Sequence, residues 1–497
     1  MKIFLMTPPD LQPTRLSRMT VVPSLGIAYV AAYVEQSGYR PTLLDPKALD
    51  LSLGEIAARL TDEKPDVIGI SFATENRFDA FETIKVIKNA SPNALLVAGG
   101  PHPSLAAEDT LKNVPGIDVV VRGEGEETFL ELLKCVERKG NFRDVKGIYF
   151  RAGNEVVYTG WRPPIAPLDS IPFPAYHLLP MEKYSYQSPF IDESEYSNVA
   201  PIITSRGCPY GCVFCATTLL WGKERGRSPQ NVVTEMCLLN DEYGKNVFWV
   251  VDDSFTYDPE RAGQICDLLI REKRGFRLLV QGARVDKVNE GLLRKLRQAG
   301  CLIITFGVES GSQRIIDGII GKRITMQQVV DTSRLCKETG MPADFGFIVG
   351  HPTETLEDVE KTLALVERIH SDGNTTAMNP MKIYPGTRLE RMAHETGALS
   401  RDFSWAIQYP KGGLLGRSIK GNAPFYFGSL DETAVYSVMA RWINMARYPI
   451  HKHALDVLSE IRSWDDLCHA IRLALAYSKE ATRSLFRRRS RSGQQAD

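Results

Sequence analysis

The 497-residue sequence lacks a long apolar run and an excess of charge of either sign. No run approaches the ~20 apolar residues that a membrane-spanning helix needs. The opening residues MKIFLMTPPD reach Pro8 and Pro9 before any apolar core of export length. We therefore expect a cytoplasmic protein with no transmembrane segment. Lysine plus arginine and aspartate plus glutamate both number 60, so no overall charge predicts a nucleic-acid partner.

Several common catalytic signatures are also missing. No G-x-G-x-x-G follows the first predicted strand, and the prolines at its end have no N–H to offer a phosphate. No Walker loop and no Ser/His/Asp arrangement can be found. The chain has eight histidines, and none pairs with a carboxylate at a metal-binding spacing. These absences argue against a dinucleotide-dependent enzyme, a nucleotide hydrolase and a serine hydrolase.

Cysteine is sparse outside one short stretch. The chain has nine cysteines, and an odd count in a long, predicted cytoplasmic chain argues against a disulfide framework. Six are scattered in apolar or helical contexts, where we expect reduced, buried thiols. These six are Cys135, Cys237, Cys266, Cys301, Cys336 and Cys468.

Residues 1–140 alternate short apolar runs with amphipathic ones. Near-continuous Val/Ile/Leu runs separated by helical stretches predict a parallel sheet covered on both faces. We expect strands at 2–8, 40–45, 66–72, 94–100 and 118–123, and helices at 24–38, 51–63, 77–90, 103–113 and 124–140. The fold class is α/β, flavodoxin-like or Rossmann-like, and ligands of such sheets lie at the carboxyl ends of the strands.

The middle of the chain predicts a hairpin, a linker and a second α/β domain. Residues 145–162 predict a hairpin that turns at 152–154, and the proline-rich residues 162–180 predict an extended linker within 141–195. Six strands, each followed by a helical stretch, are expected in 196–390. Six β/α units are too few for a closed eight-fold barrel, so we expect a partial barrel. The strands are predicted at 201–207, 246–255, 276–284, 302–310, 343–352 and 377–385.

Residues 391–497 lose this alternation and predict a small, mainly helical C-terminal domain. The basic end, LFRRRSRSGQQAD, predicts a solvated tail, with weak contact to an anionic lipid surface or nucleic acid as the alternative. Four aromatic residues either pack this domain or line an apolar pocket. They are Trp405, Tyr409, Phe425 and Tyr426.

The stretch SRGCPYGCVFCATT, residues 205–218, places three cysteines within eight residues. Cys208, Cys212 and Cys215 follow a predicted strand in the spacing C-x3-C-x2-C. A structural zinc site needs four ligands, and no fourth cysteine or histidine lies close by. Three thiolates suit a [4Fe–4S] cluster with one iron left open. Zinc or buried thiols are the alternative.

This motif, after the first strand of a six-fold barrel, resembles the radical S-adenosylmethionine (SAM) superfamily. The resemblance implies that the open iron chelates the amino and carboxylate groups of SAM, and that one electron cleaves SAM to a 5′-deoxyadenosyl radical. It also implies SAM-binding roles for residues near the cysteines and at the barrel strand ends. The glycines of the family's second-strand GGE-like patch are absent, so only an acidic role carries over there. The expected residues are Phe214, Asp252, Asp253, Arg284, Glu309, Ser310 and Gly350.

A flavodoxin-like domain before such a barrel resembles the cobalamin-binding subclass. The matching pieces are Pro23-Ser24-Leu25-Gly26, GGPHPS and RGEGEET. No Asp-x-His-x-x-Gly loop is present, which implies base-off cobalamin with no histidine lower ligand. His102 is expected to pack against the nucleotide tail and not to ligate cobalt. The implied cobalamin residues are Thr7, Pro8, Ser24, Leu25, Gly26, Ser71, Phe72, Thr74, Gly99, Gly100, His102, Ser104, Gly123, Glu124, Gly125 and Glu126.

Together these resemblances predict a cobalamin-dependent radical SAM methyltransferase, similar to class B, that transfers a methyl group through methylcobalamin to an unactivated carbon. The implied partners are a small-molecule or lipid-like substrate and an electron donor such as flavodoxin or ferredoxin. The alternative is ring formation or oxidation, as in the anaerobic Mg-protoporphyrin monomethyl ester cyclases. A redox sensor is a third possibility, but a sensor would not need the SAM residues. We expect substrate specificity from 162–200 and 391–497.

Overall fold

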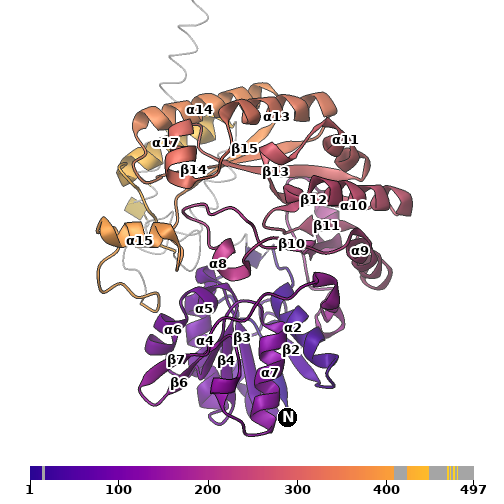
Figure 1. Cartoon of the computed structure of the whole chain (residues 1–497), viewed down its shortest axis with the longest axis vertical. Coiled ribbons are helices and arrows are strands. Elements are labelled where there is room, and N and C mark those ends of the chain that lie inside the picture. Colours follow the sequence, from indigo (N-terminus) through magenta and orange to yellow (C-terminus); the bar gives the residue numbers. More distant parts are fainter. Residues whose placement is uncertain are drawn as a thin grey trace, which may run out of the picture.

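The computed structural model describes residues 1–13, 17–18, 20–407 and 423–446, and positions 467–468, 471, 474–475 and 478. Two α/β layers make up this part of the chain, one built on a seven-stranded sheet and the other on a six-stranded sheet (Figure 1). The predicted α/β class is confirmed. The basic tail after residue 484 and Tyr409 lie outside the described residues.

The first sheet has the strand order β2-β1-β3-β4-β5-β6-β7. All five predicted strands form and pair in parallel, for example Ile3 with Val67 and Ser71 with Gly99. The predicted hairpin adds β6 and β7 in antiparallel orientation beside β5. The bounds are β1 Ile3–Met6, β2 Pro41–Leu44, β3 Val67–Ser71, β4 Leu95–Gly99, β5 Val119–Val121, β6 Ile148–Ala152 and β7 Glu155–Tyr158.

Helices cover both faces of the first sheet, because its strands carry apolar residues on both sides. Helices α2 (Leu25–Glu35) and α7 (Glu126–Glu137) contact each other over one face. Helices α3 (Leu53–Glu63) and α4 (Arg77–Ala90) cover the other. The single helix predicted at 103–113 was wrong. Two short helices form instead, α5 (Pro101–Leu105) and α6 (Ala107–Asn113), because the backbone of Ala106 leaves the helical region.

The second sheet is a six-stranded parallel partial barrel, as predicted, and its strand order is β15-β14-β13-β12-β11-β8. Its strands are β8 Val199–Ile202, β11 Val247–Val250, β12 Arg277–Ala283, β13 Cys301–Glu309, β14 Ala343–Val349 and β15 Thr375–Pro380. The strand predicted at 201–207 was wrong after Ile202, where β8 ends. The connecting helices are α9 Pro229–Tyr243, α10 Pro259–Glu272, α11 Glu290–Gln298, α13 Met326–Thr339 and α14 Leu356–Ser371. A short α12 (Gln313–Ile315) runs into a π-helical turn, η8 (Ile316–Ile320), that the sequence did not predict.

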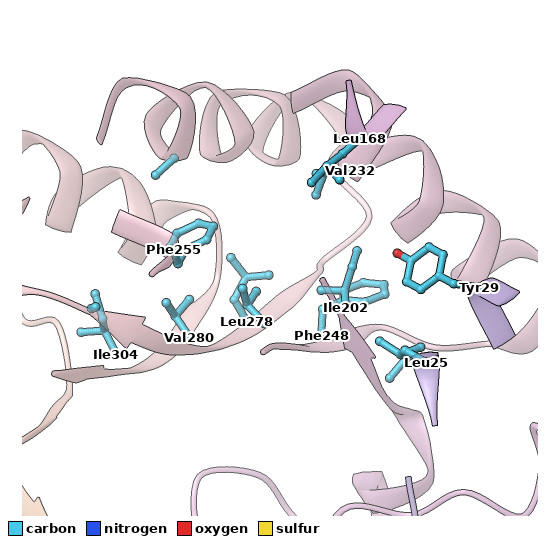
Figure 2. Close-up of a cluster of buried hydrophobic side chains, with 14 of the residues drawn as sticks. Leu25, Tyr29, Leu168, Ile202, Val232, Phe248, Phe255, Leu278, Val280 and Ile304 are labelled. Atoms are coloured by element: carbon cyan, nitrogen blue, oxygen red, sulfur yellow. The ribbon is translucent and has the colours of Figure 1, made fainter. Parts of the chain in front are cut away.

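The proline-rich linker packs tightly against both layers. The N–H of Ala175 donates to the carbonyl of Ala28 at 3.0 Å, and the Tyr184 hydroxyl donates to Asp45 at 2.9 Å. On the barrel side, the Tyr176 hydroxyl donates to Glu235 at 2.6 Å. Figure 2 shows the apolar side of this junction, where Leu168 of the linker lies in the same cluster as α2 and barrel side chains.

Two further helices follow the barrel, α15 (Arg388–Glu395) and α17 (Glu432–Met445). Trp405 and Tyr426 are buried in a small apolar cluster beside α15. Trp405 and Tyr426 therefore have a packing role, and Trp405 also lines a second cavity.

Candidate functional site

A cavity of about 470 Å³ lies between the two sheets, and we call it the intersheet cavity. Its lower wall is formed at the carboxyl ends of the first-sheet strands, for example by Ser71 and Gly99. Its upper wall comes from residues in or just after β8 and β11, including Ile203 and Asp253. Helix α8 (Thr217–Trp221), which lies between the layers in Figure 1, adds a side wall. Mostly apolar side chains line this space, which is typical of a cofactor site.

Most of the sequence-predicted cobalamin residues meet at this cavity. Glycines at the strand ends have no side chain, so the backbone itself forms part of the cavity wall. Gly100 has φ +92°, and a Cβ there would lie 2.7 Å from Ser71 Oγ and 2.8 Å from the Phe72 carbonyl oxygen. Gly100 is therefore needed for the close packing of these two strand ends. Backbone and small polar groups, such as those of Gly99 and Ser71, form the wall that a large ligand would meet. The predicted residues that line it are Ser24, Leu25, Gly26, Ser71, Gly99, Gly100, Ser104, Gly123, Glu124, Gly125 and Glu126.

Five predicted cobalamin residues lie elsewhere. Thr7, Pro8, Phe72, Thr74 and His102 do not line the cavity. The His102 ring is fully buried beside Phe72 and Trp405, and its Nδ1 is 3.1 Å from Thr74 Oγ1. Burial, with the nearby Arg77 charge, holds the pKa of His102 well below its ordinary value. In this structure His102 is a neutral residue of α5 whose ring belongs to an aromatic cluster and does not line the cavity.

The three cysteines lie on the segment 207–216, which we call the cysteine loop. Strand β9 (Ser205–Arg206) leads into it, and β9 pairs with β10 (Arg225–Gly226) after α8. Gly207 turns the chain with φ +89°, and a Cβ there would lie 2.6 Å from the Lys223 carbonyl oxygen. This turn leads the chain from Arg206, which lines the intersheet cavity, into the cysteine loop, whose residues 207–216 do not line it.

The cysteines are partly exposed and carry no disulfide. Burial raises the pKa of the Cys208 thiol and raises that of Cys212 to about 11. A bound metal must therefore offset this cost to hold them as thiolates. Across the described residues, no three His, Cys, Asp or Glu side chains converge on one metal ion. The three thiolates of a cluster bind three different irons, so the residues still fit a cluster.

Two aspartates after β11 fix the chain on both sides of Gly207. Asp252 accepts hydrogen bonds from the Thr204 N–H at 2.6 Å and the Ser205 hydroxyl at 2.7 Å. Asp253 accepts from the Gly207 N–H and from the Thr217 hydroxyl, both at 3.0 Å. Asp253 also lines the cavity, and burial raises its pKa. Asp252 is therefore committed to holding β9, whereas Asp253 faces the site.

The other predicted SAM residues surround the cysteine loop from the barrel side. Arg284 pairs with Asp286, Nε to Oδ1 at 2.9 Å, and its guanidinium carbon lies 3.6 Å from the Tyr210 ring centre. Glu309 ends β13 with φ +79°, and Lys322 Nζ donates to its Oε1 at 2.6 Å. Arg284 Nη2 also donates a hydrogen bond to the backbone carbonyl of Lys322 at 2.9 Å. Arg284, Glu309 and Lys322 are therefore linked in one group.

The remaining three residues have mainly backbone or packing roles. Ser310 is buried, and its hydroxyl accepts from the Ser312 N–H at 3.2 Å. Gly350 donates its N–H to Glu354 at 2.7 Å. The Phe214 ring lies 6.5 Å from that of His351, on the barrel side of the loop.

Sequence reasoning missed the partners of the GEGE loop, residues 123–126. Arg206 donates to Glu124 at 2.9 Å and to Glu126 at 2.7 Å, and Arg225 donates to Glu124 at 3.0 Å. Burial alone would raise the pKa of Glu124, but the two arginines hold it below its ordinary value. The signal present in the sequence was the pair of arginines that flank the cysteine motif.

Two families match this chain. Residues 13–133 match the family described as B12 binding domain, and residues 202–366 match the radical SAM superfamily. A relative from Pyrococcus horikoshii, named an uncharacterized methyltransferase, is 37% identical over 392 residues, which cover 78% of this chain and 82% of the relative. The chain belongs to the B12-binding radical SAM family.

Two further matches extend the comparison. The anaerobic magnesium-protoporphyrin IX monomethyl ester cyclase of Rubrivivax gelatinosus is 32% identical, over 72% of this chain and 64% of the cyclase, so this chain spans less than two thirds of that relative. The structure of TsrM, a radical SAM methyltransferase from Kitasatospora setae, solved with cobalamin and a [4Fe–4S] cluster, has TM-score 0.70 at 17% identity. It covers 98% of this chain and all of TsrM, which shows the shared fold. Within the described residues, no helix is long and apolar enough to cross a membrane.

Proposed function

We propose that this protein is a cobalamin-dependent radical SAM methyltransferase that methylates an unactivated carbon of an organic substrate. The observation that carries the proposal is the intersheet cavity, which the glycine loops of the first sheet enclose together with residues on either side of the cysteine loop, Arg206 before it and Trp221 of α8 after it. A cobalamin bound there would lie beside a cluster held by the cysteines. The methyltransferase name of the Pyrococcus horikoshii relative supports the reaction type.

The chain's own residues fit the groups that this reaction needs. When bound, the cluster with SAM would supply one-electron chemistry and cobalamin would supply methyl transfer. Cys208, Cys212 and Cys215 would hold the cluster as thiolates. Arg284 would offer its guanidinium to the SAM carboxylate, and Glu309 would accept hydrogen bonds from the amine or ribose. The apolar cavity wall would exclude water from the reacting groups.

The cavity also supports base-off binding of cobalamin. No histidine is among the described residues that line it, and His102 is enclosed in its aromatic cluster. Histidine is the common protein ligand for a metal below a macrocycle. We therefore propose that no histidine of this chain binds the lower face of cobalt.

Several finer parts of the proposal rest on sequence reasoning. We propose a division into 1–140 for cobalamin, 141–195 as hairpin and linker, 196–390 as the radical SAM barrel and 391–497 for substrate specificity. The electron donor would be flavodoxin or ferredoxin, the substrate a small or lipid-like molecule, and the location the cytoplasm. Contact of the basic tail with a membrane surface belongs to the same set of proposals.

The second candidate is ring formation or oxidation, which the 32% identity to the Rubrivivax gelatinosus cyclase favours. An anaerobic experiment separates the two. The protein is reconstituted with iron, sulfide and hydroxocobalamin, reduced, and given SAM and candidate substrates. Formation of both 5′-deoxyadenosine and S-adenosylhomocysteine supports methyl transfer. Formation of 5′-deoxyadenosine alone with a consumed substrate supports the cyclase-type reaction.

A matched pair of cysteine variants controls this experiment. C212S removes one cysteine of the motif, and C237S removes a partly exposed cysteine on α9 that lies outside it. We expect C212S to form neither product and C237S to behave as the unaltered protein. Equal product formation by both variants would contradict the assignment of the cysteine loop.

A further inference from the structure

Four charged side chains form a closed group at the edge of the intersheet cavity, and we call it the arginine–glutamate cluster. It consists of Arg206, Arg225, Glu124 and Glu126. The side chains of Arg206, Glu124 and Glu126 are 8%, 7% and 4% exposed. Two positive and two negative charges balance, which is how a folded protein tolerates charges at such burial.

The cluster joins the first sheet, through Glu124, to the separate two-stranded sheet formed by β9 and β10. This carboxylate binds Arg206 on β9 and Arg225 on β10, the two short strands that precede and follow 207–224. That segment contains the whole cysteine loop and α8. One side chain of the first sheet's last β-to-α turn therefore holds both ends of the segment that carries the three cysteines.

Arg206 has the most direct connection to the cysteines. Only Gly207 separates it from Cys208, and a single residue spans about 3.5 Å. The guanidinium lies between rings from both sides of the junction, 4.9 Å from the Tyr29 centre and 5.7 Å from the Trp221 centre. A shift of the Arg206 side chain would therefore be passed to the start of the cysteine loop.

The same cluster faces the cavity. All four residues of the GEGE loop line it, and so does Arg206. A ligand that fills the cavity would restrict the loop that carries Glu124 and Glu126. When these carboxylates move less, the Arg206 side chain that they bind also moves less. Coupling between two sites is symmetric in free energy, so an occupied cysteine loop should in turn favour ligand binding in the cavity.

We propose that Arg206 is a positioning residue that couples occupation of the intersheet cavity to the geometry of the cysteine loop. The proposal rests on the function proposed above, because it takes cobalamin as the cavity ligand and an iron–sulfur cluster as the occupant of the loop. It also changes the expected role of Glu124 and Glu126, which bind Arg206 and Arg225 and leave the contacts with cobalamin to the neighbouring backbone.

The test measures how fast the full-length, anaerobically reconstituted protein loses iron to EDTA, with and without hydroxocobalamin. Iron that stays with the protein after desalting is measured by emission spectroscopy, and bound cobalamin by absorbance. We expect hydroxocobalamin to slow iron loss on the order of fivefold, the low end of typical coupling between sites. R206Q is expected to bind hydroxocobalamin. Its rate of iron loss should be the same with and without hydroxocobalamin.

Two further variants keep the result decisive. E126Q removes only one of the carboxylates that hold Arg206. The ratio of its iron-loss rates without and with hydroxocobalamin should therefore fall between the ratios of the unaltered protein and R206Q. E126Q also provides the test if R206Q does not fold. R277Q removes an arginine that pairs with Glu195, Nη1 to Oε2 at 2.7 Å, at the opposite end of the barrel strands. R277Q should keep the full ratio.

The outcomes separate this proposal from the proposed function. If the unaltered protein binds no hydroxocobalamin, the proposed function fails and the coupling fails with it. If it binds hydroxocobalamin and iron loss does not change, the proposed function stands and the coupling is wrong. The coupling is also wrong if R206Q and E126Q keep the full ratio, or if R277Q loses it.

Discussion

Gly26 offers a way to fill the intersheet cavity without disturbing the protein around it. It is the second residue of α2, it lines the cavity, and a Cβ built on it meets no atom within 4 Å. The substitution Gly26→Leu would therefore place an isobutyl group in the space proposed for cobalamin. Because leucine is the better helix former, we expect the free protein to gain about 0.5–1 kcal/mol.

The chain contains a matched control for this substitution. Ser52-Leu53-Gly54 repeats the Ser24-Leu25-Gly26 sequence at the start of α3, and Gly54 is exposed and lines none of the described cavities. Gly54→Leu should give the same gain in stability without entering the cavity. Any difference in ligand binding between the two variants then reports the cavity alone.

The expected loss of hydroxocobalamin affinity in Gly26→Leu follows from the free-energy cost of adding atoms to a filled site. Inserting extra methylene groups costs about 1–3 kcal/mol, which corresponds to roughly 5- to 150-fold weaker binding. Equilibrium dialysis with hydroxocobalamin measures the dissociation constant, and thermal unfolding confirms the fold. Unchanged affinity in Gly26→Leu, or an equal loss in Gly54→Leu, would refute the placement of cobalamin in this cavity.

Three other predictions concern the barrel side of the site. Lys322→Met leaves Glu309 buried without its partner and should lower the free energy of unfolding by about 3 kcal/mol in urea denaturation, and adding Glu309→Gln should restore part of this loss. Burial raises the pKa of Glu354 from 4.5 to about 7, so its stabilising contribution is complete below pH 4.5 and is lost as the pH rises to 7. Glu354→Gln should remove this decline in melting temperature across that window, and an unchanged slope would contradict the assigned pKa. Cys212→Ser should lose most of the iron after reconstitution, and full iron content by emission spectroscopy would exclude Cys212 as a ligand.

The fold could be predicted from the sequence where local pattern decides the structure. The Val/Ile/Leu runs at 66–72 and 94–100 can be buried only in a sheet covered on both faces, and both strands form. Ser52 and Glu55 form a capping box that starts α3 close to the predicted boundary. The break at Ala106 carried no signal, because alanine is the strongest helix former.

The site was harder to predict because its contacts join distant parts of the chain. Arg206 and Glu124 are 82 positions apart and meet only because the carboxyl ends of the strands of both sheets meet at the same cavity. Lys322 reaches Glu309 across the unpredicted π-helical turn η8. The cysteine spacing, in contrast, is local chemistry, and it identified the loop without any knowledge of packing.

The apolar cluster of Figure 2 has a consequence for how the protein unfolds. Leu25 and Tyr29 of α2, Leu168 of the linker, and Ile202 and Phe248 of the barrel belong to one continuous core. The α2–α7 face of the first sheet therefore shares its core with the barrel, whereas the α3–α4 face has a separate core. Melting of one layer would uncover apolar surface on the other, so the two should lose structure in a single cooperative transition, and a fragment that carries only one layer should aggregate.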